Sequence, residues 1–571
     1  MKTKKLMALM LVTMIAMSSV TACKKSTAVP TETKNDAPVT LKIWADAFEK
    51  SFPSGIQDDP VAKEITKKTG VIMDITPGNA FTDYPQKLAA ALASNDLPDI
   101  FLADGNIAPK IISSKTVLQL DPYLDKYAKA FVNETPKTLE YQKKFGNADV
   151  EGKRDGKVYY LPMRADLNTD PLQVQVAPYL RWDLYEKMGY PKINSIDDYI
   201  PILKKMMEME PTNKDGKKNY GVSGWFGDWG NWVFGAGFGM MNGTNEASVA
   251  TTIGTNKMYS SFTDPNSGIW QGLEWYNKAV RAGIMDPDAP TMKWDQFLEK
   301  SKANRFFFAL APWQVDNGNQ TFTADKTLEK GYVQMPPAIK TDKYMVDFNT
   351  PYGGMNYYVS KNTKYPEKAV ALLDYFLSIE GSELIWNGVK GVNWDVENGK
   401  VVVKKETLDG LANDANYKLT SGVYKYHNLA GRGKSFIDPK LNVPLYFQYQ
   451  EQYTLARMTP IMKKAADYFK VPVLGDLYMK NKDFKFTISQ PAPRVTTTIP
   501  DDIKSITTKA DNYYNDNYMK IMMSKSEAEF QTAKTKFIEG EKTIGIEKVV
   551  DWNLAEFNKV EPGKWSKESI K

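Results

Sequence analysis

The chain has 571 residues, of which 42% are apolar and 25% charged, a balance typical of folded globular proteins and not of disordered ones. At this length we expect two or more domains with full cores. The formal net charge of +6 is diffuse, and Lys2, Lys4 and Lys5 supply three of those charges. Nucleic-acid-binding proteins cluster their basic residues, so this pattern argues against a nucleic-acid partner.

The chain contains one cysteine, Cys23, and one histidine, His427. A metal site built on several histidines is therefore excluded. A disulfide and a Cys–His nucleophile pair in the body of the protein are excluded as well. A serine triad would have to use His427, but no nucleophile-elbow motif accompanies it. Because tyrosines flank this histidine, we interpret it as a structural loop residue.

Residues 1–22 have the pattern of a secretory signal peptide, with three lysines, a short apolar run over residues 6–17 and small residues before Cys23. That run is too short to be a good membrane-spanning helix. The sequence VTAC at 20–23 resembles the lipobox of bacterial lipoproteins, in which the cysteine is diacylated and becomes the mature N-terminus. The alternative is an ordinary signal peptide with a chance cysteine. We predict an exported protein that lipid on Cys23 anchors to the outer face of the cell membrane.

Residues 23–38 are polar, contain prolines and lack apolar periodicity, so we interpret them as a flexible tether. Strand and helix patterns alternate directly after it. This order predicts right-handed crossovers and a largely parallel sheet. We expect strands over residues 40–44, 71–75 and 100–102 and helices over residues 60–69 and 83–94.

Polar and aromatic residues follow the ends of these expected strands. Trp44 and Asp46 stand at the end of the first strand, and Asp104 and Asn106 follow the third. The carboxyl ends of parallel strands meet at one edge, which is where open α/β sheets bind ligands. We expect ligand contacts there, although Asp104 and Asn106 also suit a turn.

Residues 221–243 combine tryptophans with glycines and are too irregular for an amphipathic helix. We therefore interpret the stretch as a loop. Aromatic side chains on such a loop suit stacking on a flat ligand, and packing in a core is the alternative role. A buried strand over residues 306–310 leads into a further tryptophan, Trp313.

Residues 211–220 partly fit a calcium-binding loop. Asn213, Asp215, Lys217 and Asn219 would be the ligating positions. Pro211 occupies the first position in place of aspartate, and lysines surround the site, so a plain polar turn is the alternative. We expect no required cofactor and, at most, a structural calcium ion.

Further elements follow in chain order, and no internal repeat is present. We expect a strand over 158–160, a turn and strand over 350–359, and helices over 181–188, 195–208, 270–282, 366–378, 500–520 and 525–539. A capping box from Ser195 to Asp198 predicts where the second of these helices begins.

An ordered set of segments resembles the extracellular solute-binding proteins of bacterial ABC importers, family 1, and more narrowly the long lipoprotein branch that serves oligosaccharide importers. The segments are LKIW, LPDIF, DGKVYYLP, LRWDLYEKMGYPKINSIDDY, FFFALAPW and YPEKAVALLDYFLSIEGSELIWNG. The resemblance covers most of the mature chain, and Trp313 matches the family's stacking position after the proline.

The resemblance implies an α/β fold of two lobes, periplasmic-binding-protein-like and of type II. Each lobe would be a mostly parallel sheet flanked by helices, with the ligand in the cleft between the lobes. Residues 39–170 and 351–395 would form lobe 1, and residues 171–350 and 396–571 would form lobe 2.

The implied function is the capture of an oligosaccharide and its presentation to the permease subunits of an ABC importer, without catalysis. We expect a monomer whose only contact with the membrane is its lipid anchor. Sugar rings stack on aromatic side chains, and their hydroxyls pair with Asp, Asn and Arg. The candidate contacts are Trp44, Asp46, Asp104, Asn106, Arg164, Asp166, Asn168, Trp225, Trp229, Trp232, Trp313, Tyr352 and Asn356.

Three other functions stay open at this point. An oligopeptide-binding lipoprotein has a similar length and anchor. A secreted glycoside hydrolase or lyase would use paired carboxylates, and sequence spacing does not reveal such pairs among 68 acidic residues. A surface protein that captures glycans independently of a transporter is the third.

Overall fold

The first sheet begins directly after the expected tether and has the order β2-β3-β1-β4-β14-β5. Strands β1, β3 and β4 are parallel, as the sequence predicts, whereas the outer pairings are antiparallel. The strands are β1 (Val39–Ala45), β2 (Gly55–Ile56), β3 (Val71–Pro77), β4 (Ile100–Asp104), β5 (Leu161–Pro162) and β14 (Met355–Val359).

The structure is a computed structural model and describes most of the chain after the tether. The described residues are 37–45, 53–78, 84–146, 149–150, 153–165, 176–252, 256–337, 344–345, 355–414, 416–479, 486–487 and 499–568.

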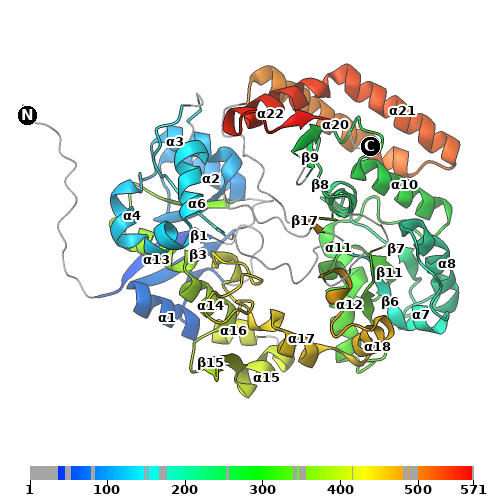
Figure 1. Ribbon diagram of the computed structural model, residues 1–571, viewed down its shortest axis with the longest axis horizontal. Helices are drawn as coiled ribbons and strands as arrows, with labels where there is room; N and C mark the ends of the chain where they lie inside the picture. The colour runs from blue at the N-terminus through cyan, green and yellow to red at the C-terminus, as the bar shows by residue number, and fades with distance from the viewer. Residues whose placement is uncertain are drawn as a thin grey trace, which may run out of the picture. The chain divides into compact units, whose positions relative to one another are not determined.

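Helices cover both faces of the first sheet. Helices α1 (Pro60–Thr69) and α13 (Pro366–Leu377) lie on one face, and α2 (Tyr84–Ser94) lies on the other (Figure 1). Local chemistry fixes both ends of α1. The side chain of Asp59 accepts a hydrogen bond from the Ala62 amide at 3.0 Å, and Gly70 ends the helix with φ of 69°.

The strand expected over residues 158–160 is displaced along the chain. Val158 instead forms loop hydrogen bonds, with its amide donating to Asp121 Oδ2 at 2.8 Å. Leu161 is the residue that pairs with Tyr357 of β14. A distant strand therefore sets this register, and the local pattern does not.

The core on the α1 side of the sheet continues well past the expected boundary at residue 395. Val401, Tyr426 and Phe447 belong to the same buried cluster as Leu41 of β1. A second cluster runs from Val176 to Val549 and excludes that stretch. We therefore propose that the stretch from 396 to about 450 belongs to lobe 1, because its apolar side chains pack in the same cluster as those of β1.

Short helices and a hairpin complete lobe 1. They are η1 (Gly105–Ile107), α3 (Ala108–Ser114), α4 (Asp121–Tyr127), α5 (Lys129–Glu134), α6 (Pro136–Tyr141), η2 (Gln142–Gly146), α14 (Ile379–Asn387), β15 (Trp394–Glu397), β16 (Lys400–Val403), α15 (Lys405–Asn413), α16 (Tyr417–Ser421), η5 (His427–Leu429), η6 (Phe447–Tyr449) and α17 (Glu451–Arg457).

The main sheet of lobe 2 has the order β12-β6-β11-β7, from β6 (Tyr179–Arg181), β7 (Tyr220–Val222), β11 (Phe306–Ala309) and β12 (Tyr332–Gln334). Only β11 and β7 are parallel, and β6 is antiparallel to both of its neighbours. The expectation of a mostly parallel sheet is wrong for this lobe, and in the first sheet only two of the five strand pairings are parallel. Strand β6 enters from the other lobe and not from a βαβ unit, so no crossover helix fixes its direction.

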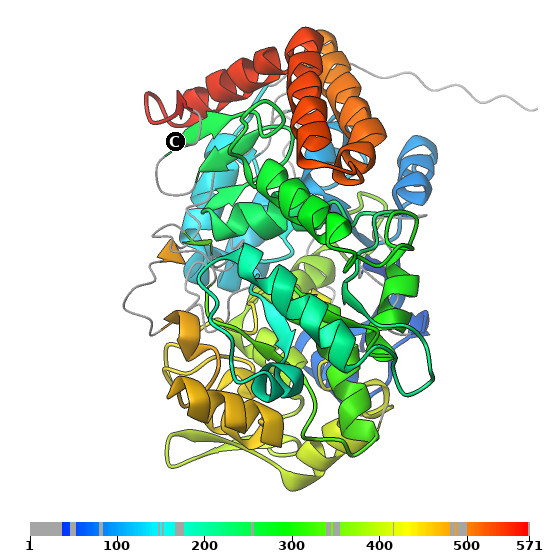
Figure 2. The same cartoon turned by 90° about the vertical axis from the view of Figure 1, so that its right-hand side faces the viewer.

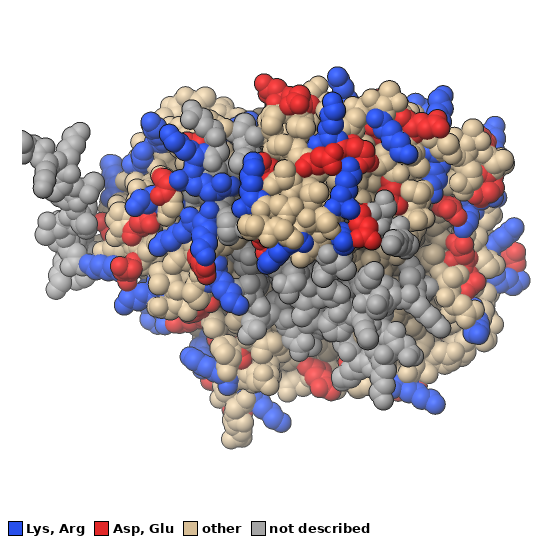
Figure 3. All heavy atoms as spheres, turned by 45° about the horizontal axis from the view of Figure 1, so that its top comes forward, with Lys and Arg blue, Asp and Glu red and all other residues tan. Residues whose placement is uncertain are grey.

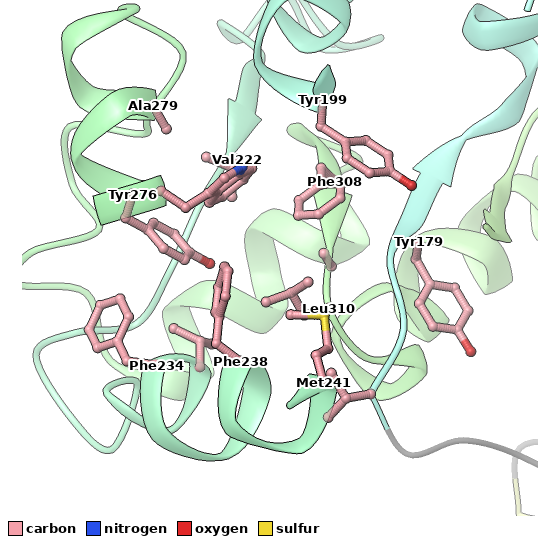
Figure 4. Packing of buried hydrophobic residues seen from close by; sticks show 14 of the residues in the cluster. Tyr179, Tyr199, Val222, Phe234, Phe238, Met241, Tyr276, Ala279, Phe308 and Leu310 are labelled. Carbon is pink, nitrogen blue, oxygen red and sulfur yellow. The ribbon is translucent and has the colours of Figure 1, made fainter. Parts of the chain in front are cut away.

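Aromatic side chains dominate the core of lobe 2. Figure 4 shows Phe234, Phe238 and Tyr276 close together, and Tyr199 beside Phe308 of β11. Residues 221–243 were expected to be a loop, but they include η4 (Val233–Phe238) and α9 (Gly239–Met241). Both pack against α10 (Gly268–Arg281). A Cβ on Gly268 would lie 2.4 Å from the Gly239 backbone nitrogen, so glycine makes this close packing possible.

The capping box at Ser195 and Asp198 is present, and it begins η3 (Ile196–Asp198) and then α8 (Tyr199–Met209). The other elements of this part are α7 (Trp182–Lys187), β8 (Thr244–Asn245), β9 (Ala250–Thr252), β10 (Lys257–Tyr259), α11 (Trp294–Lys302), α12 (Pro312–Ala324), β13 (Tyr344–Met345), α18 (Pro460–Phe469), α19 (Asp476–Met479), β17 (Phe486–Thr487) and β18 (Ser566–Lys567).

Three long helices end the chain: α20 (Asp501–Met522), α21 (Glu527–Ile544) and α22 (Ile546–Val560). Helices α20 and α21 lie side by side in Figure 2, and the sequence predicts both but not α22. Within the described ranges, no helix combines the length and apolarity needed to cross a membrane. Basic and acidic side chains both occur across the described part of the face in Figure 3, with more basic ones toward its left-hand side.

Glu541 of α21 provides a test of pH-dependent stability. Its side chain is completely buried, and neither carboxylate oxygen has a hydrogen-bond partner among the described residues. Burial, with added repulsion from Asp511, raises the pKa of Glu541 from 4.5 to about 8. The folded protein therefore binds this proton more tightly than the unfolded chain, and its stability falls as the pH rises from about 4.5 to about 8.

We expect Glu541→Gln to raise the free energy of unfolding by about 1–3 kcal/mol at pH 8.5 and to change it little near pH 4.5. Thermal or urea unfolding at the two pH values measures this difference. Exposed Glu539 on the same helix gives the control variant Glu539→Gln, for which we expect no such pattern. A stabilisation that is equal at both pH values would contradict the assignment.

Candidate ligand-binding site

Five tryptophans of lobe 2 come together, and we call them the tryptophan cluster. Ring centroids within it lie 5.0–5.8 Å apart, at mostly tilted or edge-to-face angles. Three of its members follow β7, and one stands at the first residue of α11 and one in the first turn of α12. The members are Trp225, Trp229, Trp232, Trp294 and Trp313.

Two glycines let the loop after β7 approach its neighbours closely. A Cβ on Gly227 would lie 2.3 Å from the Thr291 carbonyl oxygen, and one on Gly230 would lie 2.5 Å from the Trp225 carbonyl oxygen. The Gly227 amide donates to the Met292 carbonyl at 3.0 Å. The loop is thereby fixed against the segment that leads into α11, which brings Trp294 beside the other tryptophans.

Exposure differs across the cluster. Trp225 is 1% exposed and forms its base, whereas Trp229 is 40% exposed. Trp232, Trp294 and Trp313 are half-buried. Aromatic faces that remain open to solvent can stack on another flat apolar face, such as the C–H face of a sugar ring. Of the tryptophans proposed from the sequence, Trp225 serves the core, and the others line a surface.

Asp316 adds a carboxylate beside this surface. It lies one helical turn after Trp313 on α12, so both side chains share a face of the helix. Asp316 is exposed, but protein atoms around it reduce the hydration of its carboxylate and raise its pKa to about 6, against the opposing attraction of Lys434 in lobe 1. A carboxylate that keeps solvent contact while neighbouring atoms displace water is suited to accept hydrogen bonds from ligand hydroxyls.

The residues proposed in lobe 1 are more dispersed. Trp44 of β1 packs edge-on to Tyr84 at 6.3 Å, and the ammonium of Lys87 lies 4.0 Å from its ring centroid. Asp104 is exposed at the end of β4. Asn356 of β14 is buried, and its side-chain oxygen has no hydrogen-bond partner.

Several proposed contacts remain without a structural description. Four of them lie outside the described residues: Asp46, Asp166, Asn168 and Tyr352. Asn106 belongs to η1, but its side chain lies outside the described part. Arg164 is half-buried after β5, with its guanidinium carbon 6.0 Å from the Trp386 ring centroid. These residues stay predictions.

Sequence reasoning missed two members of the site in lobe 2. Trp294 joins the cluster only through the tertiary contact between the loop after β7 and the segment before α11, and nothing in its spacing shows this. Asp316 was detectable in principle, because it stands three residues after Trp313. We did not expect a helix at α12, so the sequence did not show that Trp313 and Asp316 share one face of it.

The possible calcium loop is closed by its own hydrogen bonds. Asn213 Oδ1 accepts from the amides of Asp215 and Lys217 at 3.1 and 2.9 Å. The Lys217 carbonyl accepts from the Asn213 amide at 2.8 Å, and the ammonium of Lys214 pairs with Asp325. Asn219 Oδ1 is buried without a partner. Calcium takes six to eight oxygen ligands. This loop has one carboxylate, and Asn213 Oδ1 and the Lys217 carbonyl already accept hydrogen bonds, so the loop does not fit calcium.

We expect chelation with EDTA, followed by addition of calcium, to change the melting temperature by less than about 1 °C, since a loop that binds no ion gains nothing from it. Differential scanning calorimetry measures this. A calcium-dependent rise of several degrees that Asp215→Ala abolishes would contradict the interpretation.

A cavity of about 800 Å³ lies apart from the tryptophan cluster, within lobe 1. Hairpin β15–β16, α15 and α17 surround it, and apolar side chains such as Val401, Leu411 and Phe447 line it. No proposed contact falls in this cavity.

Comparisons with known proteins identify the family to which this chain belongs. The family model described as bacterial extracellular solute-binding protein matches residues 61–402, more than half of the chain. The lipoprotein LipO of Bacillus subtilis (strain 168) is 25% identical over 419 residues, which cover 69% of this chain and 74% of LipO.

Solved structures match over nearly the whole chain. The alginate-binding protein AlgQ2, without calcium ion, has a TM-score of 0.59 at 17% identity and covers 92% of this chain and 99% of its own. The ABC-transporter substrate-binding protein FusA of Streptococcus pneumoniae, in complex with kestose, has a TM-score of 0.59 at 15% identity, with the same coverage. A solute-binding protein of Bifidobacterium longum infantis has 0.58 at 14%, over 91% and 99%.

At these identities the structural likeness shows the fold, and it confirms the two-lobe α/β architecture that the sequence predicts. The family match confirms the resemblance drawn from the ordered segments. This chain belongs to the bacterial extracellular solute-binding proteins.

Proposed function

We propose that this protein is the substrate-binding lipoprotein of a bacterial ABC importer and that it captures an oligosaccharide. The observation that carries the proposal is the tryptophan cluster, whose outer members present aromatic faces beside the carboxylate of Asp316. Flat apolar faces with hydroxyls at the rim are the chemistry of sugars, and this surface is complementary to both features.

The mode of capture follows from the two lobes. The tryptophans would cover the sugar faces, and Asp316 would accept hydrogen bonds from hydroxyls. Closure of lobe 1 over the bound ligand would exclude water and strengthen those hydrogen bonds. The closed state then becomes the populated one by differential affinity, and it is the shape that we propose the permease reads. No catalytic step and no metal ion is part of this proposal.

Anchoring is the second part of the proposal. The sequence around Cys23 supports a lipid anchor on an exported protein, and the relative LipO carries the name lipoprotein. Such an anchor would hold the binding protein near its permease at the outer face of the membrane. We propose a monomer, with the oligosaccharide and the permease subunits as its partners.

A ligand screen tests the proposal. We expect one class of oligosaccharide to raise the melting temperature by several degrees, because a ligand that binds only the folded state stabilises it by mass action. The panel contains neutral oligosaccharides, acidic oligosaccharides and peptides of matched length. Isothermal titration calorimetry then gives the affinity of each hit.

Two outcomes would contradict the proposal. Tight binding to peptides and to no oligosaccharide would favour an oligopeptide-binding lipoprotein. Turnover of an oligosaccharide that disappears on a single Asp or Glu substitution would make the protein an enzyme.

A further inference from the structure

Lobe 1 carries a second group of aromatic side chains, which we call the aromatic wall. Its members are Trp386, Tyr424, His427, Tyr446 and Tyr449. Trp386 is buried at the base, with its ring 5.5 Å from both Tyr424 and Tyr446. Tyr424 stacks on His427 at 4.7 Å and 16°. The wall joins residues of α14 with those of η5 and η6, which are far apart in the sequence.

The backbone at Tyr424 is held in an uncommon conformation. Its φ is 64°, in the left-handed region that costs a non-glycine residue about 1–2 kcal/mol. A hydrogen bond from the Tyr424 amide to the Ile385 carbonyl at 3.0 Å and the packing on Trp386 maintain it. Such strain concentrates at functional sites, and here it orients a half-buried tyrosine ring.

Two cations stand at this wall, and neither has a carboxylate partner among the described residues. The guanidinium carbon of Arg164 lies 6.0 Å from the Trp386 ring centroid, and the ammonium of Lys434 lies 5.2 Å from that of Tyr449. Both side chains are half-buried, and they repel each other. In the part of the chain that the structure describes, neither forms an ion pair. Arg432, two residues before Lys434, shows the contrast, because it is buried and paired with Glu134 at 3.0 Å.

One electrostatic interaction links the aromatic wall to the side of lobe 2 that carries the tryptophan cluster. Lys434 interacts electrostatically with Asp316, which shares a helix face with Trp313. No hydrogen bond or ion pair joins Lys434 to Asp316 among the described residues. The two cations therefore belong to the same aromatic wall, and the charge of Lys434 reaches Asp316 of lobe 2. Lys434 also interacts with Tyr449 and Tyr424 of the wall.

We propose that Arg164 and Lys434 form an anion subsite that binds an oxyanion on the sugar, either a uronate carboxylate or a sulfate ester. The inference rests on the proposed function and specifies its substrate class. A guanidinium binds an oxyanion through two parallel hydrogen bonds, and an ammonium adds a point charge. The tyrosines beside them supply an apolar floor for the ring that carries the anion. Both cations attract a negative charge placed between them, so an acidic ligand gains more here than a neutral one.

Calorimetric titration with three trisaccharides of equal length tests the subsite: one neutral, one of uronic acid and one sulfated. We expect an acidic trisaccharide to bind best and its affinity to fall as salt rises. Arg164→Gln and Lys434→Gln should each weaken its binding by at least about tenfold while changing neutral binding less than about twofold. The control is Lys440→Gln, an exposed lysine near Lys434 in the same segment, which should change neither. The preferred anion distinguishes uronate from sulfate.

Other outcomes separate this inference from the proposed function. If the neutral trisaccharide binds tightest and both variants keep wild-type affinity for every ligand, the anion subsite is wrong and oligosaccharide capture stands. If the variants lose neutral and acidic binding equally, the residues act through hydroxyls or packing, and the subsite is again wrong. If no oligosaccharide binds, the proposed function itself is wrong, and the anion subsite that rests on it is wrong as well.

Discussion

Replacing Trp313 with alanine is expected to weaken oligosaccharide binding about thirtyfold, or about 2 kcal/mol, a loss typical of a central tryptophan at a binding surface. Trp313 contacts all four other members of the tryptophan cluster, at 5.1–5.8 Å between ring centroids. Truncation therefore removes a stacking face and leaves the neighbouring rings without support. Calorimetry with the best ligand of the screen measures the change in affinity.

Two variants control for loss of structure. Trp552 of α22 is also half-buried and lies outside the cluster, so Trp552→Ala should leave the affinity unchanged. Trp313→Phe keeps an aromatic face and should recover most of the binding. Wild-type affinity in Trp313→Ala would mean that this ring only packs in the protein. If Trp552→Ala unexpectedly weakens binding as much as Trp313→Ala does, the loss comes from general destabilisation and not from the missing stacking face.

The parts of the fold that the sequence predicts are those in which local chemistry determines the structure. Pro60 and Gly70 fix the two ends of α1, and its predicted and observed bounds are the same. The strand–helix order of residues 39–104 predicts the three parallel strands at the centre of the first sheet. The capping box at Ser195 is a further signal of this kind, since it needs no tertiary contact.

Long-range pairing is what sequence patterns did not reveal. Strand β5 takes its register from β14, nearly two hundred positions later in the chain. Strand β6 pairs antiparallel with β11 and β12, whose directions no neighbouring helix determines. The return of residues 401–447 to the first core is equally invisible locally, because their apolar side chains fit either core by composition.

The sequence likewise predicts some residues of the candidate site and not others. Three tryptophans within eight positions, Trp225 to Trp232, predict an aromatic surface from the sequence alone. Trp294 and Trp386 enter the site only through tertiary contacts. Interpreting His427 as a plain loop residue overlooked its stacking on Tyr424, which the sequence does not show because Tyr424 must adopt a positive φ.

The largest expected loss of stability comes from Arg181, the last residue of β6. Its side chain is completely buried and donates two hydrogen bonds to Asp183, each at 2.9 Å, and two to Glu210, at 3.0 and 3.2 Å. Burial alone would raise the pKa of Asp183, but the charge of Arg181 outweighs it and holds that pKa below its ordinary value. The network therefore keeps a buried carboxylate ionised at neutral pH.

We expect Arg181→Met to lower the free energy of unfolding by about 3–5 kcal/mol, because it leaves the charge of Asp183 buried without its partner. Urea denaturation at pH 7 measures the change. Lys278→Met removes two partly exposed ion pairs, with Asp197 at 2.8 Å and with Glu274 at 3.0 Å, and we expect it to cost less than about 1 kcal/mol. Adding Asp183→Leu to Arg181→Met should recover much of the loss, since the unpaired charge is then gone. Equal losses for Arg181→Met and Lys278→Met would show that burial does not set the strength of this pair.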